Sequence, residues 1–340
     1  MKCLIYTDLH FCERYSIVSK FGKKYTVRLE NQLASLNWAE RLAEDRGCKL
    51  IVCAGDFFDK SSLSQDELTA LRDVKWSQIK HYFLVGNHES EEADLHYSST
   101  KALEATDRDV ISEPCVLNYG SFELAFLPYT PESQRKPLSE VFYKAYNPRL
   151  LISHNDLLGV QMGPAVSSVG FAPDELAANC DLCVNGHLHN GQWINDKVLN
   201  LGNLTGKDFG EDASRYPHRA LIVDTDGMKT EFVENPYALN FYKINVDEEA
   251  DFAALAKLKP NAVVSLQCPI RLLADAKSKL EGNANVVCCR VIAKQDAAND
   301  VDISDIAELA VDHCAKFAEC CRAKFEASPV LEAELAEILK

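Results

Sequence analysis

Long apolar runs are absent from this sequence of 340 residues. No segment approaches the ~18 consecutive apolar residues that a membrane-spanning helix needs. The apolar stretch after Met1 reaches a carboxylate at Asp8, which is too early for the core of a secretory signal peptide. These absences predict a protein that is not associated with a membrane and that stays in the cytoplasm.

Positive charge is also in short supply. The sequence has 36 Lys and Arg residues against 51 Asp and Glu residues, which gives a formal net charge of -15. Such a charge repels a polyanion at long range and argues against a free-standing, high-affinity nucleic-acid binder. Work on DNA would therefore need local basic patches, metal ions or a partner protein.

Cysteine is plentiful, with 13 residues, but its distribution does not favour disulfides. The number is odd, the chain is long, and many cysteines lie in apolar, strand-like runs such as residues 287–289. We therefore expect reduced, buried thiols. Cys180 and Cys183 have the spacing of a zinc ribbon, but no second pair matches them, so we expect ordinary thiols there.

Strand patterns alternate with helical patterns in the first half of the chain. Residues 2–7 and 49–54 are predicted strands, and between them apolar residues recur at helical spacing until Gly47. Ser64 begins a capping box that opens a second helix. Further buried strands are predicted at residues 82–85, 122–127, 150–152 and 182–184. This order predicts an α/β fold.

The pattern divides the chain into three parts. Residues 1–240 form the predicted catalytic domain, closed by a hairpin that turns at Asp226-Gly227. Residues 241–300 restart as strand, helix, strand, helix, strand, so we expect a small α+β accessory domain there. Residues 301–340 are predicted helices with an apolar stripe, nine acidic residues and four basic ones. A solvated outer face is the expected role of that charge, and docking to a partner is the alternative.

Five short polar motifs each follow a predicted strand, where ligands bind in open α/β sheets. One motif alone would be weak, because an isolated Asp-x-His or His-x-His arises by chance. Together they hold five of the nine histidines, which argues against a purely structural role. The motifs are Asp8-Leu9-His10, Gly55-Asp56-Phe57-Phe58-Asp59, Gly86-Asn87-His88-Glu89, His154-Asn155 and Gly186-His187-Leu188-His189.

These residue types suit a pair of metal ions. Carboxylates can bridge two ions and neutral imidazoles complete nitrogen and oxygen sites, while the absence of cysteine argues against structural zinc. Mn²⁺ therefore fits this mixture better than a closed zinc site does. Two ions about 3.5–4 Å apart can clamp attacking and leaving oxygens and lower the pKa of a shared water to about 7. Their net positive charge would attract a phosphate.

In residue types and order, the motifs resemble the calcineurin-like metallophosphoesterases, over roughly residues 1–233. Within that superfamily the chain is most similar to the SbcD-type DNA exonuclease subunits, which pair with an SbcC-type coiled-coil ATPase. The similarity rests on residues 7–10, residues 55–59, residues 199–211 and the small domain after them. It implies a two-sheet α/β sandwich with a small C-terminal α+β accessory domain and terminal helices.

The resemblance implies seven metal ligands. The first of two divalent ions would be held by Asp8, His10 and His189. The second ion would be held by Asn87, His154 and His187. The carboxylate of Asp56 would bridge the two ions.

The resemblance also implies the chemistry. His88 would contact the scissile phosphate and assist the leaving oxygen, and Asp59 would orient His88, which suits an imidazole acid. The implied activity is that of an Mn²⁺-dependent DNA exonuclease that is also an endonuclease. It would act in recombination, repair or phage replication, in the cytoplasm of a bacterial cell or a phage-infected host. The implied partners are DNA, an SbcC-like ATPase and a second copy of the chain.

Two features depart from the SbcD-type pattern. Residues 201–204 read Leu-Gly-Asn-Leu where Pro-Gly-Ser is common, and the appended region is compact. Both bear on the substrate path and the partner contacts. A stand-alone phosphodiesterase or phosphatase on small molecules or phosphoproteins is therefore the alternative function. A non-enzymatic scaffold is disfavoured, because every metal position is filled.

Basic residues are few near the motifs. Residues 207–219 carry Lys207, Arg215 and Arg219, and residues 14–28 mix lysines with aromatics; both could contact phosphates and bases, although exposed loops are the simpler interpretation. Residues 202–207 lack the spacing of a phosphate-binding loop, so an ATPase would be a separate protein. Surface or packed positions are expected for the remaining histidines, which are His81, His96, His218 and His313.

Overall fold

The computed structural model describes residues 1–14, 16–90, 95, 97–120, 122–142, 149–162, 165–211 and 213–294. The chain divides into two compact units, Met1–Ala293 and Lys294–Lys340, and all described residues except Lys294 belong to the first. The predicted helices of residues 301–340 lie outside the described residues, as do His96 and His313. Among the described residues, no helix has both the length and the apolar character needed to cross a membrane.

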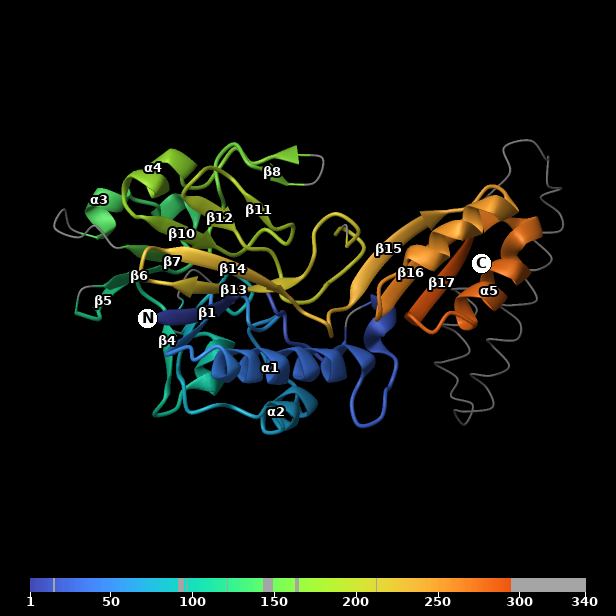
Figure 1. Cartoon of the computed structure of the whole chain (residues 1–340), viewed down its shortest axis with the longest axis horizontal. Coiled ribbons are helices and arrows are strands. Elements are labelled where there is room, and N and C mark those ends of the chain that lie inside the picture. Colours follow the sequence, from blue (N-terminus) through green and yellow to red (C-terminus); the bar gives the residue numbers. More distant parts are fainter. Residues whose placement is uncertain are drawn as a thin grey trace, which may run out of the picture. The chain divides into compact units, whose positions relative to one another are not determined.

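The first unit contains two six-stranded sheets (Figure 1). The first sheet has the order β14-β13-β1-β2-β3-β4, in which β1 to β4 are parallel and β13 is antiparallel to β1. Its strands are β1 (Lys2–Tyr6), β2 (Leu50–Cys53), β3 (Lys80–Leu84), β4 (Arg108–Ile111), β13 (Arg219–Asp224) and β14 (Lys229–Glu234).

The second sheet has the order β11-β12-β10-β7-β6-β5, with a parallel centre from β12 to β6. Its strands are β5 (Cys115–Asn118), β6 (Glu123–Leu127), β7 (Leu150–Ser153), β10 (Leu182–Asn185), β11 (Gln192–Trp193) and β12 (Val198–Asn200). A separate two-stranded ribbon consists of β8 (Gln161–Met162) and β9 (Ala165–Val166).

Apolar side chains that alternate along the strands produce three packed layers of core. Ile5 and Val52 of the first sheet share one buried cluster with Phe126 and Val184 of the second, so the two sheets face each other. The opposite face of the first sheet packs against α1 (Val27–Asp45) and α2 (Gln65–Leu71). The opposite face of the second sheet packs against α3 (Leu138–Val141) and α4 (Pro173–Ala178). The predicted two-sheet α/β sandwich is confirmed.

Local signals in the sequence mark the helix ends as expected. The side chain of Thr26 caps α1, and Gly47 follows that helix with φ +65°. Ser64 and Glu67 form the predicted capping box at the start of α2. Single-turn 3₁₀ segments complete the catalytic region; they are η1 (Ser16–Ser19), η2 (Ser99–Leu103) and η3 (Glu132–Gln134).

Residues 240–294 build a third sheet, with the order β15-β16-β17. The elements are β15 (Asn240–Asn245), η4 (Glu249–Lys257), β16 (Ala262–Pro269), η5 (Ile270–Leu272), α5 (Leu273–Glu281) and β17 (Val286–Lys294). This order matches the predicted alternation, although the first helix is of the 3₁₀ type. The segments η4 and α5 cover one face of the sheet, where Phe252 and Leu280 share a core of their own.

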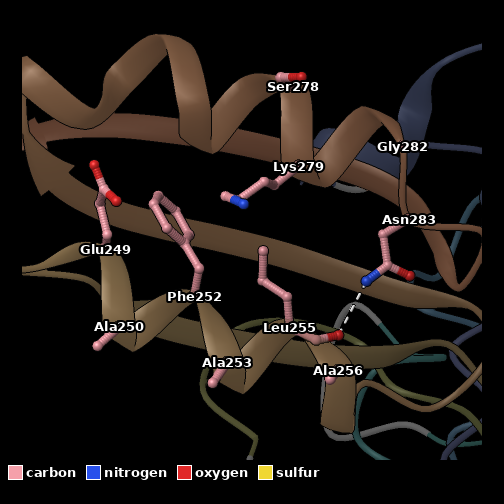
Figure 2. Close-up of a pocket in the computed structure, with 10 residues that line it drawn as sticks. All are labelled: Glu249, Ala250, Phe252, Ala253, Leu255, Ala256, Ser278, Lys279, Gly282 and Asn283. Atoms are coloured by element: carbon pink, nitrogen blue, oxygen red, sulfur yellow. Dashed lines mark hydrogen bonds between the residues drawn. The ribbon is translucent and has the colours of Figure 1, made fainter.

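A groove of about 610 Å³ runs between η4 and α5 (Figure 2). Its walls include Phe252, Leu255 and Lys279, and Asn283 closes one end by donating a hydrogen bond to the carbonyl of Leu255. No residue of the five motifs lines it. The groove is therefore separate from the predicted chemistry.

The ten cysteines in the described part of the chain are free thiols. Eight of them are buried, as expected, whereas Cys115 is half-buried and Cys289 is exposed. Cys289 lies on β17, the edge strand of the small sheet, where the next residue, Arg290, is exposed as well.

Candidate metal centre

The five motifs meet at one end of the sandwich. The first three follow β1, β2 and β3 in the first sheet, and the other two follow β7 and β10 in the second. Because these strands are parallel within each sheet, their carboxyl ends lie along one edge. Three overlapping groups of predicted residues result, in each of which the ligand atoms lie within 4.8 Å of one another. They are Asp8, His10 and His189; Asp56, His154 and His187; and a third that joins the other two, His10, Asp56 and His88.

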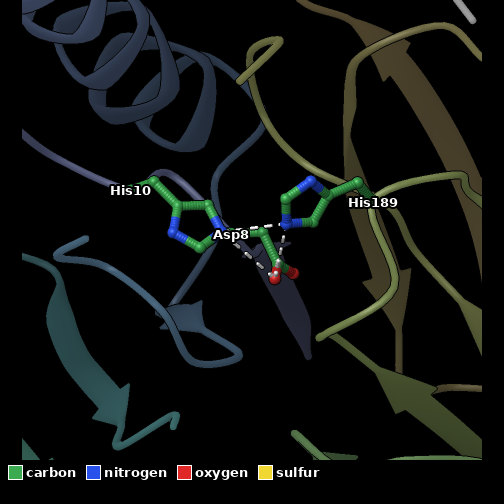
Figure 3. Close-up of side chains that lie close together, drawn as sticks. All are labelled: Asp8, His10 and His189. Atoms are coloured by element: carbon green, nitrogen blue, oxygen red, sulfur yellow. Dashed lines mark hydrogen bonds and ion pairs between the residues drawn. The ribbon is translucent and has the colours of Figure 1, made fainter. Parts of the chain in front are cut away.

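The first group is Asp8, His10 and His189 (Figure 3). The Nε2 atoms of the two histidines are 3.0 Å apart, and they lie 3.8 and 4.0 Å from Oδ1 of Asp8. Two nitrogens bound to one ion at about 2.1 Å and a right angle would also be about 3.0 Å apart. The spacing of the imidazoles thus fits a shared cation.

The hydrogen bonds of the two rings sharpen this fit. Nδ1 of His189 donates to Oε1 of Glu211 at 2.9 Å, and Nδ1 of His10 lies 3.1 Å from Oδ1 of Asp59 and 3.3 Å from Nζ of Lys207. Burial lowers the pKa of His10 to about 4, so this ring is neutral and one of its two nitrogens carries a lone pair. Two Nε2 atoms so close therefore need a proton or a metal ion between them.

The second group is Asp56, His154 and His187, with Asn87 beside it. Nδ1 of His154 donates to the carbonyl of Ala54 at 2.7 Å, which turns Nε2 toward Oδ2 of Asp56 at 3.2 Å. Oδ1 of Asn87 lies 3.0 Å from Nδ1 of His187. Carboxylate, amide oxygen and imidazole therefore converge, as in a nitrogen and oxygen metal site.

Charge balance in the second group also favours a cation. Burial alone would lower the pKa of His154, but the carboxylates of Asp56 and Asp8 raise it to about 10. The same histidine lowers the pKa of Asp56 against the effect of burial. A buried cluster of two carboxylates thus holds positive charge, which a proton supplies here and a metal ion could supply instead.

His88 lies at the mouth of the centre, with 34% of its side chain exposed. Its ring is 4.7 Å from that of His10, and its backbone N–H donates to Oδ1 of Asp56 at 3.1 Å. Nδ1 donates to the main-chain carbonyl of Asp59 at 3.0 Å, whereas the Asp59 carboxylate is 3.6 Å away. Asp59 therefore contacts His88 through its backbone, and its carboxylate is closer to His10.

Three further polar residues surround the centre, and the sequence predicted a role for none of them. Glu211 contacts His189, Asp156 accepts from Nε2 of His187 at 3.0 Å, and Glu89 accepts from the N–H groups of Gly86 and Phe58. Burial and the charge of Asp56 raise the pKa of Glu89 to about 8. A sequence signal existed only for Glu89, inside Gly-Asn-His-Glu, and for Glu211, at the end of residues 199–211.

Four of the predicted ligands have a left-handed backbone. The φ angles are 50° at Asp8, 48° at His10, 49° at Asp56 and 76° at His187. Such conformations cost about 1–3 kcal/mol each for residues other than glycine, and they cluster at functional sites. Hydrogen bonds from nearby groups hold these conformations. Nε2 of Gln32 on α1 donates to the carbonyl of His10 at 2.6 Å, and the N–H of His10 donates to the carbonyl of Asp56 at 3.0 Å.

The basic residues near the centre are less available than the sequence predicts. Lys207 is buried, with Nζ 2.8 Å from Oδ1 of Asp59. The guanidinium of Arg219 lies 3.6 Å from the centre of the Phe232 ring. Arg215 is exposed and lies over Tyr216. Of these three cations, Arg215 is therefore the one that faces solvent.

The other described histidines belong to hydrogen-bonded cores. His81 is buried and its Nε2 lies 2.9 Å from Glu40, and Nδ1 of buried His218 lies 2.7 Å from Oδ1 of Asn203. Neither belongs to a ligand group among the described residues. The expected packed positions are confirmed for both.

Comparisons with known proteins agree with this geometry. The calcineurin-like phosphoesterase family profile matches residues 1–191, more than half of the chain. This chain belongs to that family of metallophosphoesterases, which works with a dimetal centre, and the three groups of residues supply candidate ligands for one.

Individual relatives are distant. The "Putative phosphoesterase 078R" of Invertebrate iridescent virus 3 is 25% identical over 190 residues, which cover 51% of this chain and 52% of that protein. The chain thus spans about half the length of this curated relative. A solved structure described as a dimetal phosphatase from Danio rerio is 13% identical, covers 69% of this chain and 98% of its own, and has a TM-score of 0.41.

Proposed function

We propose that the chain hydrolyses phosphodiester bonds in DNA as the nuclease subunit of an SbcCD-like complex. The observation that carries the hydrolytic part is the convergence of His10 and His189, whose Nε2 atoms are 3.0 Å apart beside Asp8. The choice of DNA rests on the similarity of residues 7–10 and 55–59 to the SbcD-type subunits. The work in recombination, repair or phage replication follows from that same similarity.

The proposed ligand assignment uses both groups. Asp8, His10 and His189 would hold one ion, Asn87, His154 and His187 the other, and Asp56 would bridge them. When bound, two such ions supply positive charge for the phosphate and an activated water. We propose Mn²⁺, because these groups contain nitrogen and oxygen donors and, among the described residues, no cysteine.

The remaining residues would handle the leaving group. Because Nδ1 of His88 donates to the carbonyl of Asp59, Nε2 is the nitrogen that faces the substrate side. A ring protonated on both nitrogens could give the Nε2 proton to the departing oxygen and keep the Nδ1 bond. The exposed position of His88 suits contact with the scissile phosphate. Asp59 would orient His88 through its carbonyl, with its carboxylate committed to His10 and Lys207.

The charge distribution supports a partner for work on DNA. The chain has a formal net charge of -15, and Lys207 and Arg219 near the centre are engaged inside the protein. A polyanion would therefore gain little attraction from this part of the surface. An SbcC-like coiled-coil ATPase, and a second copy of this chain, would add the missing contacts.

The same charge distribution supports the alternative, which is a stand-alone phosphodiesterase or phosphatase on small molecules or phosphoproteins. Such substrates need no long basic groove. The names of the relatives, a phosphoesterase and a dimetal phosphatase, fit this alternative about as well as they fit the proposed nuclease.

End-labelled double-stranded DNA and a small phosphodiester, offered to the purified chain in Mn²⁺, in Mg²⁺ and in chelator, test the proposal. The Asp56→Asn variant is the control, because it removes the bridging charge with little change of shape. Mn²⁺-dependent shortening of DNA that the control lacks would support the nuclease. Cleavage of the small ester beside intact DNA, also after addition of an SbcC-type ATPase, would favour the alternative. A chain that binds no ions and cleaves neither substrate would contradict both.

A further inference from the structure

The outer nitrogens of the two histidines in the first group are both tied to carboxylates. Nδ1 of His189 lies 2.9 Å from Oε1 of Glu211, and Nδ1 of His10 lies 3.1 Å from Oδ1 of Asp59. A carboxylate accepts and cannot donate, so the bond between His189 and Glu211 requires a proton on Nδ1 of His189. Nε2 of His189 is then free to bind a cation.

Glu211 is held firmly in its place. Its side chain is 5% exposed, and it also accepts from Nδ2 of Asn203 at 2.7 Å and from the backbone N–H of Lys207 at 3.1 Å. The segment 203–211 therefore folds around this carboxylate. An anchored acceptor can fix the direction of the His189 ring more strongly than a mobile one.

Lys207 holds the carboxylate of Asp59 in a similar way. Its side chain is 8% exposed, and Nζ lies 2.8 Å from Oδ1 of Asp59 and 3.3 Å from Nδ1 of His10. Lys207 is near enough to donate to Nδ1 of His10, but a cation on Nε2 requires the ring proton on Nδ1. In that arrangement the carboxylate of Asp59 can accept from Nδ1 and pair with the ammonium of Lys207. Arg28 on α1 fixes the same loop, because its Nη1 donates to the carbonyl of Gly206 at 2.6 Å.

We propose that Glu211 and the Lys207–Asp59 ion pair are positioning residues for the first metal ion, which they do not touch themselves. They set the tautomer and the direction of His189 and His10, so that both Nε2 atoms meet at one point. The inference rests on the proposed dimetal function. It names the residues that set the affinity of the first of the two sites for its metal ion. Loss of such an outer partner typically weakens metal binding about 10–100-fold.

Titration calorimetry with MnCl₂ tests the proposal on the full chain, with Glu211→Ala as the main variant. We expect two ions in the wild-type protein, and in Glu211→Ala one site weakened about 10–100-fold with the other unchanged. Glu211→Gln keeps an acceptor oxygen and should recover most of the affinity. The matched control is Glu231→Ala, which removes a surface carboxylate paired with Arg46. Equal affinities in Glu211→Ala and in the control would overturn the proposal.

A second variant separates the two sites. Asp156 holds the outer nitrogen of His187 at 3.0 Å, so Asp156→Ala should weaken the other ion and leave the first unchanged. If Glu211→Ala and Asp156→Ala weakened the same site, the assignment of Glu211 to the first ion would be wrong. Thermal unfolding of each variant without metal shows whether it is folded.

A measurement on the wild-type protein needs no folded variant. In imidazole ¹⁵N NMR of the Mg²⁺-loaded chain, His189 and His10 should carry their proton on Nδ1, and a proton on Nε2 of either ring would overturn the proposal. Failure of the proposed dimetal chemistry looks different, because the wild-type chain would then bind no pair of ions at all. That result would remove the basis of this inference together with the function.

Discussion

One added methyl group at Gly55 should disable the metal centre through His154. Gly55 follows β2 and has φ +99°, and a Cβ atom built there would lie 2.2 Å from Nδ1 of His154. Ordinary contacts begin at 3.4 Å, so the ring would have to retreat by about 1.2 Å. That movement would break the 2.7 Å bond from Nδ1 of His154 to the carbonyl of Ala54.

The expected effects of Gly55→Ala differ in size for folding and for chemistry. A left-handed backbone costs an alanine about 1–2 kcal/mol, and the displaced ring adds to that loss of stability. A displacement of about 1 Å in a catalytic site can lower turnover about 100-fold. We therefore expect moderate destabilisation, weaker binding at the second ion site and turnover of a small phosphodiester reduced about 100-fold.

Gly47 supplies the matched control, because it has φ +65° and nothing lies within 4 Å of a Cβ atom built there. Gly47→Ala should show the backbone penalty alone, with metal binding and turnover unchanged. Thermal unfolding, Mn²⁺ calorimetry and ester hydrolysis of both variants complete the comparison. If Gly55→Ala bound two ions and turned over like Gly47→Ala, the close approach of His154 would have no functional meaning and the reasoning would fail.

Three other changes test the centre. His88→Ala should keep both ions and lose about 10²–10⁴-fold in turnover, since His88 is proposed to move a proton; calorimetry showing a lost ion would reassign it as a ligand. Chelator should lower the melting temperature, because ions that bind only the folded chain stabilise it by mass action; an unchanged melting curve would argue against tight sites. Because Asp56 and Asp8 raise the pKa of His154 to about 10 against the effect of burial, this ring must lose a proton to bind an ion. Mn²⁺ affinity should thus rise between pH 6 and pH 9 with proton release, and affinity independent of pH would contradict this account.

In the two large sheets, most of the strands that could be predicted from sequence are buried on both faces. Residues such as Leu50–Cys53 and Leu182–Asn185 form continuous apolar runs, because they lie between the facing sheet on one side and helices on the other. The edge strands β4 and β5 are half-buried, and their apolar runs, residues 110–111 and 115–117, are too short to mark a strand. The position of β13 beside β1 was not predictable either, since that pairing joins residues more than 200 positions apart.

The same contrast applies to the candidate centre. Its predicted ligands follow strands directly, and parallel strands bring their carboxyl ends together by topology alone. Glu211 and Asp156 lie on loops, and what makes them part of the centre is a contact with His189 or His187 across the fold. A lone acidic residue in a loop has no pattern of its own. The ligands are therefore visible in a sequence, whereas the residues that orient them need the structure.

The centre also bears on how the two sheets are held in register. The interface between them is apolar, as at Ile5 and Val184, and apolar contacts have little directional preference. Directed bonds cross between the sheets at the ligand end, where the N–H of His187 donates to Oδ2 of Asp8 at 3.0 Å and Nδ1 of His154 donates to the carbonyl of Ala54. Ions held by residues of both sheets would strengthen this same end. The strained backbones of Asp8 and His187 lie at this end too. Free energy gained when ions bind there would therefore help to offset the cost of these conformations.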